Sequence, residues 1–107
     1  MTTLIELIPV LLNKTADRKI PWEDGGDRSF IAVFGDNIVK IKYDHQSQSV
    51  DYRLSLLNSE GSILESYAPD RQTDESETLE ELWDAARRRA FLVDDRLDTL
   101  KKMLNDL

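Results

Sequence analysis

The sequence contains no cysteine, a single histidine (His45), three prolines and four glycines among its 107 residues. Without cysteine there is no disulfide bond, thiol nucleophile, Cys-ligated zinc or iron–sulfur cluster. One histidine per chain gives neither a site of several histidines for a metal nor a spare imidazole for a catalytic triad. These shortages exclude many common enzyme chemistries and are compatible with a reducing compartment.

Long apolar runs and a positive charge balance are also missing. No segment approaches the ~20 apolar residues that cross a bilayer. Glu6 interrupts the first short apolar run, and no basic residue precedes it, so we expect no signal peptide and a cytoplasmic protein. The formal net charge is −7, which argues against direct binding to nucleic acid or to an anionic membrane, since both need a basic surface.

The residues that are present suffice for one domain over residues 1–107. Hydrophobic residues make up 40% of the chain, and two tryptophans, three tyrosines and three phenylalanines supply bulky core material. Thr3 and Glu6 form a capping-box pattern, and apolar residues then recur at helical spacing, which predicts a helix over residues 3–14. Pro9 lacks the N–H that would bond the Ile5 carbonyl, so we expect the helix to kink or begin there.

In the middle of the chain, residues 20–68, apolar and polar residues alternate as they do in half-buried strands. Strands are predicted at 29–34, 38–43, 50–56 and 63–68, joined by short turns that favour antiparallel neighbours, with one face of the sheet staying polar. The acidic, glycine-containing segment 23–27 is expected to be a turn. Its three carboxylates could hold a hard cation, but they lack the spacing of a calcium loop.

The last third of the chain, residues 77–107, predicts a helical region. Apolar residues repeat there with alternating spacings of four and three, a heptad pattern without Pro or Gly: Leu79, Trp83, Ala86, Ala90, Val93, Leu97, Leu100, Leu104 and Leu107. A straight helix of this length spans about 43 Å, whereas a body of this size is ~30–35 Å across. The helix must therefore overhang, fold back near 91–95 with Asp94 capping a second helix, or pack on a second chain.

Two capping patterns compete for the start of this region. Asp74 pairs with Glu77 in one, and Thr78 pairs with Glu81 in the other. An acidic block extends over residues 70–84, where seven acids and one base give a net charge of −6. Because acids in the first turn of a helix are favoured by its dipole, helix-start chemistry explains part of this block. We retain Asp70, Asp74 and Glu75 as candidates for binding a basic partner.

Three consecutive arginines, Arg87 to Arg89, are the only dense basic segment. Their side chains fan around the helix and cannot all hold one anion. Pairing with Asp84 on a solvated face explains Arg87 and Arg88, and a partner or phosphate contact through Arg88 or Arg89 is the alternative. His45 is expected to be an exposed loop residue, and no phosphate loop or paired-carboxylate motif appears.

Both tryptophans, Trp22 and Trp83, are expected in the core. Three stretches of short motifs follow each other in the chain: residues 11–15 with 20–23, residues 52–56 with Gly61, and residues 79–83 with 86–88. In this order they resemble a loose group of small bacterial proteins of uncharacterised function. The resemblance implies a standalone helix–meander–helix protein and carries over no catalytic residue.

We therefore expect an α+β fold: an N-terminal helix, a four-stranded antiparallel meander, and a long or bent C-terminal helical region packed on the sheet. No catalytic residue, cofactor or metal is predicted. The leading hypothesis is a non-enzymatic interaction module (an adaptor, regulator or inhibitor) that dimerises through Leu97, Leu100, Leu104 and Leu107. The alternatives are a ligand-binding domain or modest enzyme with a pocket near Trp22, Tyr52 and Arg88, and an acidic phosphate mimic.

Overall fold

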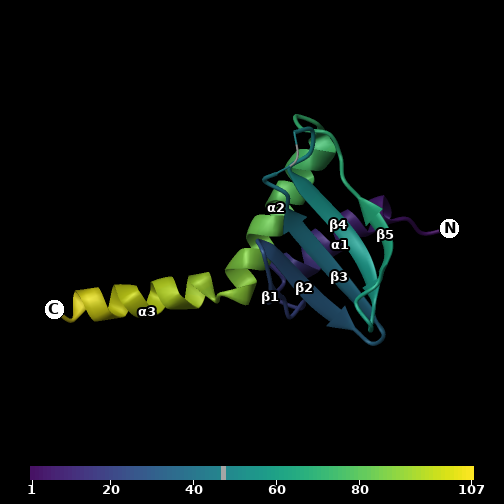
Figure 1. Cartoon of the computed structure of the whole chain (residues 1–107). Coiled ribbons are helices and arrows are strands. Elements are labelled where there is room, and N and C mark those ends of the chain that lie inside the picture. The colour runs from purple at the N-terminus through teal and green to yellow at the C-terminus, as the bar shows by residue number, and fades with distance from the viewer. Residues whose placement is uncertain (47) are drawn as a thin grey trace.

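The chain runs through one helix, five strands and two helices in the computed structural model, which describes residues 1–46 and 48–107 (Figure 1). The elements are α1 (Leu4–Ala16), β1 (Glu23–Gly26), β2 (Ser29–Phe34), β3 (Asn37–Tyr43), β4 (Tyr52–Asn58), β5 (Ile63–Tyr67), α2 (Asp74–Ala90) and α3 (Val93–Asn105). The strands form one antiparallel sheet in sequence order. The predicted α+β class and meander are confirmed. Ser47, which falls between β3 and β4 in the sequence, lies outside the described residues.

The prediction of four strands was wrong by one, because β1 occupies the segment expected to be a turn. Asp24 pairs with Phe30, and a bulge follows before Gly26 pairs with Ser29. The turn instead falls on Asp27 and Arg28, which have φ values of 48° and 58°. A two-residue turn with two positive φ values suits the twist of a hairpin, so the chain reverses later than the glycines suggested.

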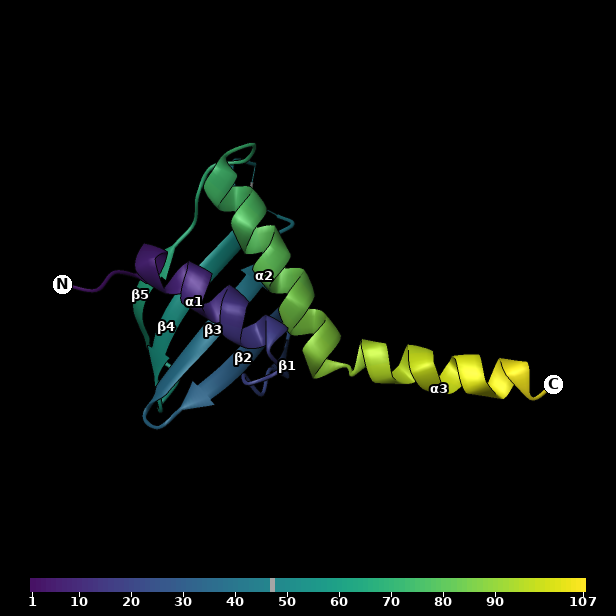
Figure 2. The ribbon, with the colours of Figure 1, turned by 180° about the vertical axis from the view of Figure 1, so that it is seen from behind.

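One face of the sheet is covered by α1 and α2, which lie side by side across it (Figure 2). The core between these layers contains side chains from both helices, from the segment that joins α1 to β1 and from the inner face of the sheet: Leu4, Ile8, Leu11, Ile20, Trp22, Phe30, Ala32, Val39, Ile41, Tyr52, Leu54, Leu79, Leu82 and Ala86. Trp22 is buried as predicted, and its indole Nε1 donates to Thr15 Oγ1 at 2.9 Å. Thr15 in turn donates to the Leu11 carbonyl, so the buried polar atoms are satisfied without leaving the core.

The first helix begins at the predicted capping box. The Thr3 side chain accepts from the Glu6 backbone, and the Glu6 side chain accepts from the Thr3 backbone. The helix runs from Leu4 through Pro9 to Ala16, close to the predicted 3–14. Of the two effects expected of Pro9, a helix start at that residue was therefore wrong. Ile5 and Pro9 both lie on the exposed face, where water can solvate the carbonyl that loses its backbone donor.

Neither predicted cap starts the second helix. The hydroxyl of Thr73 accepts from the Ser76 N–H at 3.1 Å, and α2 begins at Asp74 rather than at residue 77. Trp83 is half-buried and packs against the core, with its indole N–H donating to the Arg28 carbonyl at 3.0 Å. The expected core position of Trp83 is therefore confirmed in part, because the residue packs against the core but is only half-buried.

The predicted helical region 77–107 is bent between α2 and α3, and α3 leaves the body, by which we mean α1, the sheet and α2. The chain turns at Phe91 and Leu92, and α3 then projects away from the sheet (Figure 1). The molecule consequently measures 53 × 33 × 24 Å with a radius of gyration of 15.2 Å, above the ~13 Å of a compact chain of this length. The prediction that the whole region packs on the sheet is wrong for α3.

Candidate interaction surface

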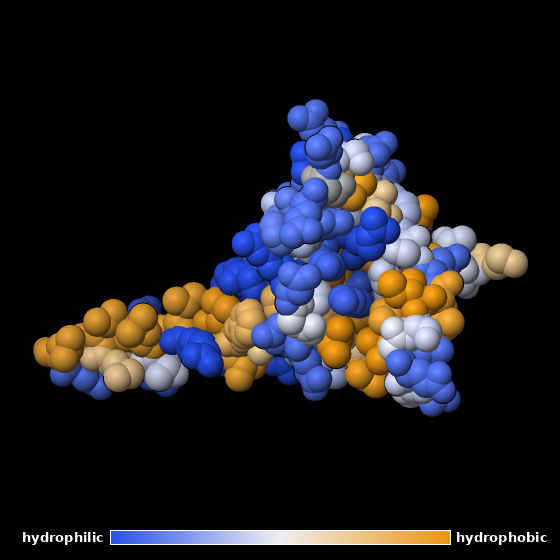
Figure 3. Space-filling model, viewed as in Figure 1, coloured by the Kyte–Doolittle hydropathy of each residue, from blue (hydrophilic) through white to orange (hydrophobic). Residues whose placement is uncertain are grey.

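The helix α3 presents an apolar face that no described part of the chain covers. None of its residues is buried. The exposed fractions of Leu97, Leu100 and Leu104 are 53%, 49% and 57%, and Leu107 just beyond the helix is 99% exposed. Figure 3 shows hydrophobic side chains gathered along one side of α3, from its C-terminal end up to the body. We call Val93, Leu97, Leu100, Leu104 and Leu107 the α3 stripe.

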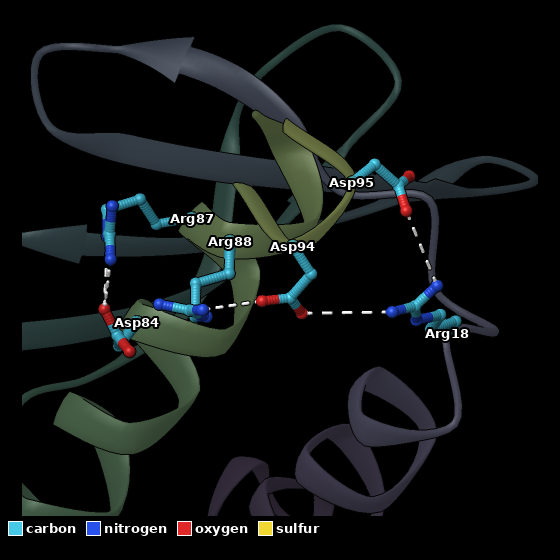
Figure 4. A network of polar contacts seen from close by, with 6 residues as sticks. All are labelled: Arg18, Asp84, Arg87, Arg88, Asp94 and Asp95. Atoms are coloured by element: carbon cyan, nitrogen blue, oxygen red, sulfur yellow. Dashed lines mark hydrogen bonds and ion pairs between the residues drawn. The ribbon is translucent and has the colours of Figure 1, made fainter. Parts of the chain in front are cut away.

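The bend before α3 is held by a strained residue and by charge pairs. Leu92 has a φ of 53°, a left-handed conformation that costs a non-glycine residue roughly 1–2 kcal/mol. Arg88 donates to Asp94 at 2.6 Å, and Arg18 lies 3.9 Å from both Asp94 and Asp95 (Figure 4). These contacts join the end of α1 and the end of α2 to the first turn of α3.

The predicted role of Asp94 as a helix cap is wrong. The N-cap position of α3 is Leu92, which provides no side-chain hydrogen bond. Asp94 instead lies inside the first turn, where its carboxylate accepts from Arg88 and raises the pKa of that guanidinium. The pair spans six residues, so only the break between the helices brings the two side chains together.

The three arginines separate as their helical positions require. Arg87 donates to Asp84 at 2.8 Å, which confirms the predicted pairing for that residue. Arg88 turns instead to Asp94 (Figure 4). The buried Arg89 Nε has no hydrogen-bond partner within the described residues. A phosphate contact through Arg88 or Arg89 remains untested.

The acidic candidates lie at the opposite end of α2 from the arginines. Asp70, Asp74 and Glu75 are all exposed, and about thirteen residues of helix at ~1.5 Å each separate Glu75 from Arg88. Asp74 and Glu75 also line a shallow hollow beside Ile5 of α1. The sequence-based candidates therefore form two separate surfaces.

A second exposed apolar surface, which sequence analysis missed, lies on the outer face of the sheet. Val33, Ile38, Leu57 and Ile63 are neighbours across β2, β3, β4 and β5. Ile38 is half-buried and Leu57 is buried, so the exposed part of the row is at its two ends. Val33 and Ile63 are 51% and 63% exposed. The expected polar face is thus polar only in part. The alternation within each strand could have revealed this row once the pairing register was known.

The residues proposed for a ligand pocket have separate structural roles. Trp22 and Tyr52 are core residues, and burial raises the pKa of Tyr52 to about 12. Arg88 lies at the bend and points to Asp94 (Figure 4). His45 is exposed, as expected, and stacks on Tyr43 with a ring separation of 6.1 Å.

Across residues 1–46 and 48–107, no group of three or more histidine, aspartate or glutamate side chains is placed to hold a metal ion. No helix in that part of the chain has the length and apolarity needed to span a membrane. Comparisons with protein families, with curated proteins and with solved structures found no match to this chain. The resemblance to small bacterial proteins and the cytoplasmic location therefore remain predictions.

Proposed function

We propose that this chain is a non-enzymatic protein-interaction module that self-associates through the α3 stripe. The observation that carries the proposal is an amphipathic helix that lies outside the folded body and has no buried residue. Fully burying one leucine side chain contributes roughly 1.5–3 kcal/mol. A row of leucines that stays half in water therefore has a large unused driving force, and such contiguous apolar surfaces mark protein interaction sites.

The length of α3 supports the same conclusion. The helix has thirteen residues, which is close to the limit at which an isolated helix is marginal in water. In folded proteins the stability of such a helix comes mainly from packing its apolar face. Since the body does not provide that packing, a second protein chain is the natural source of it, and a homodimer is the simplest assembly.

The acidic end of α2 is proposed as a second contact, for a basic partner. Asp74 and Glu75 are exposed beside the apolar side chain of Ile5, which is itself 51% exposed. An apolar hollow with an acidic rim fits a segment that combines apolar and basic side chains. This surface would let a dimer act as an adaptor or inhibitor.

Sedimentation velocity across protein concentrations tests the self-association. The wild-type chain should change from monomer to dimer as concentration rises, and Leu100→Glu should stay a monomer because it places a charge in the stripe. Val33→Glu is the matched control, since it adds the same charge to the other exposed apolar surface. A wild-type chain that remains a strict monomer at high micromolar concentration would contradict the proposal.

A further inference from the structure

We infer that the occupant of the α3 stripe is the α3 helix of a second copy, lying antiparallel, with Asp94 of each copy facing Lys101 of the other. This inference rests on the proposed function and adds the partner surface and its orientation. It is carried by the order of charges beside the stripe and by the position of the body relative to α3.

The stripe sets the register of an antiparallel pair. Val93, Leu97, Leu100 and Leu104 follow each other at spacings of four, three and four, so they alternate between the two core positions of a heptad. When the helices run in opposite directions, Leu97 of one copy meets Leu100 of the other, and Val93 meets Leu104. All four side chains are then covered by equivalent residues of the second copy, as a twofold dimer requires.

The charges that flank the stripe favour this orientation over a parallel one. Asp94 and Lys101 lie on one side of the stripe, and Arg96 and Met103 lie on the other. A parallel pair would place Arg96 opposite Lys101 of the second copy, which is repulsive. An antiparallel pair places Asp94 opposite Lys101 twice, and Arg96 beside the apolar Met103. Flanking charges of this kind set helix orientation.

Both members of the proposed charge pair are accessible in the single chain. The Asp94 side chain is 52% exposed although it accepts from Arg88, and a carboxylate has room for several donors. Lys101 is exposed, and none of the ion pairs among the described residues includes it. Neither group needs to be extracted from the fold before it can reach the second copy.

The position of the body gives an independent reason for the same orientation. The body lies entirely at the N-terminal end of α3 (Figure 2). A parallel pair would therefore bring two bodies side by side, each from a chain with a net charge of −7. An antiparallel pair puts them at opposite ends and brings Leu107 toward the bend of the second copy, where Phe91 and Leu92 are exposed.

A charge reversal at Lys101 distinguishes the two orientations by the sign of its effect. In an antiparallel dimer, Lys101→Glu sets two acids against each other and should raise the dimer Kd roughly tenfold. In a parallel dimer the same change would set the introduced carboxylate against Arg96 of the second copy and lower the Kd, which would overturn the inference. Lys102→Glu is the matched control, because it changes the same charge on the outer side of α3 and should leave the Kd within about twofold.

Single cysteines test the register directly, because the chain has none of its own. An oxidised mixture of Val93→Cys and Leu104→Cys chains should form the mixed disulfide, and neither variant should link efficiently to itself. Self-linking of Val93→Cys, or cross-linking of α3 to a cysteine at Val33 instead, would overturn the inference while the proposed self-association stands. A wild-type monomer in sedimentation would overturn both.

Discussion

The helices α2 and α3 share one continuous apolar pattern and have opposite surroundings. In α2, Leu79 and Ala86 of this pattern are fully buried against α1 and the sheet, and so is Leu82, which lies beside the pattern. In α3 the leucines of the same pattern are about half exposed. The difference arises at Leu92, where the chain turns away from the sheet before the second half of the pattern can reach it. An apolar face predicts that a helix needs a neighbour, and the bend decides whether that neighbour belongs to the same chain.

Matched truncations in the two helices should give the largest difference. Leu82→Ala removes a fully buried side chain from α2 and should lower the free energy of unfolding by about 2–5 kcal/mol. Leu97→Ala in α3 should change it by less than about 1 kcal/mol in dilute solution, where the stripe is in water. Urea unfolding followed by tryptophan fluorescence measures both. Equal losses from the two substitutions in the dilute monomer would contradict the division of the chain into a packed body and an exposed α3.

Alkaline pH should destabilise the body through the buried phenol of Tyr52, whereas α3 contains no tyrosine. Burial raises the pKa of Tyr52 to about 12, so the folded state favours the neutral phenol. The corresponding stability is complete below about pH 10, the ordinary pKa of tyrosine, and is lost as the pH rises from there to about 12. Tyr52→Phe cannot ionise and should retain roughly 2 kcal/mol that the wild type loses over that range. Urea unfolding curves of both proteins at neutral pH and across that range make the comparison, and parallel losses would show that Tyr52 is not responsible.

The N-terminal caps of α2 and α3 differ, and removing the cap of α2 should give the smallest of these changes in the free energy of unfolding. The hydroxyl of Thr73 caps α2, whereas α3 has no side-chain cap. Thr73→Ala should therefore lower the free energy of unfolding by about 1 kcal/mol. Thr78→Ala is the control on the same helix, because the Thr78 hydroxyl donates only to the Asp74 carbonyl within the helix, a contact that adds little. Chemical denaturation at neutral pH measures the two losses, and a larger loss for Thr78→Ala would contradict the assignment of the cap.

Sequence reasoning predicted what depends on local pattern. The Thr3 capping box, strand β2 and the apolar face over residues 79–107 follow from residue types and spacing alone. The fifth strand was missed because two glycines indicated a turn, whereas pairing with β2 extended the strand and moved the turn to Asp27 and Arg28.

The residues of the candidate surface could be predicted from the sequence, but their exposure outside the body could not. The leucines of the stripe are visible in the sequence, and so are the charges beside it. A bend near residues 91–95 was one of three possibilities that the sequence left open, and no Gly or Pro there favours it over a straight helix. The contacts of Arg18 and Arg88 with the first turn of α3 come from elsewhere in the fold and are not visible in the local sequence. The row that includes Val33 and Ile63 was missed for a similar reason, since it exists only once four strands are in register.

Hydrogen exchange of the α3 amides at two protein concentrations most directly tests whether another copy completes this helix. The account predicts that protection of residues 93–105 rises strongly from low to high micromolar protein, while protection in α2 stays constant. Protection of α3 that is the same at both concentrations would contradict it, because the helix would then be stable without a second chain.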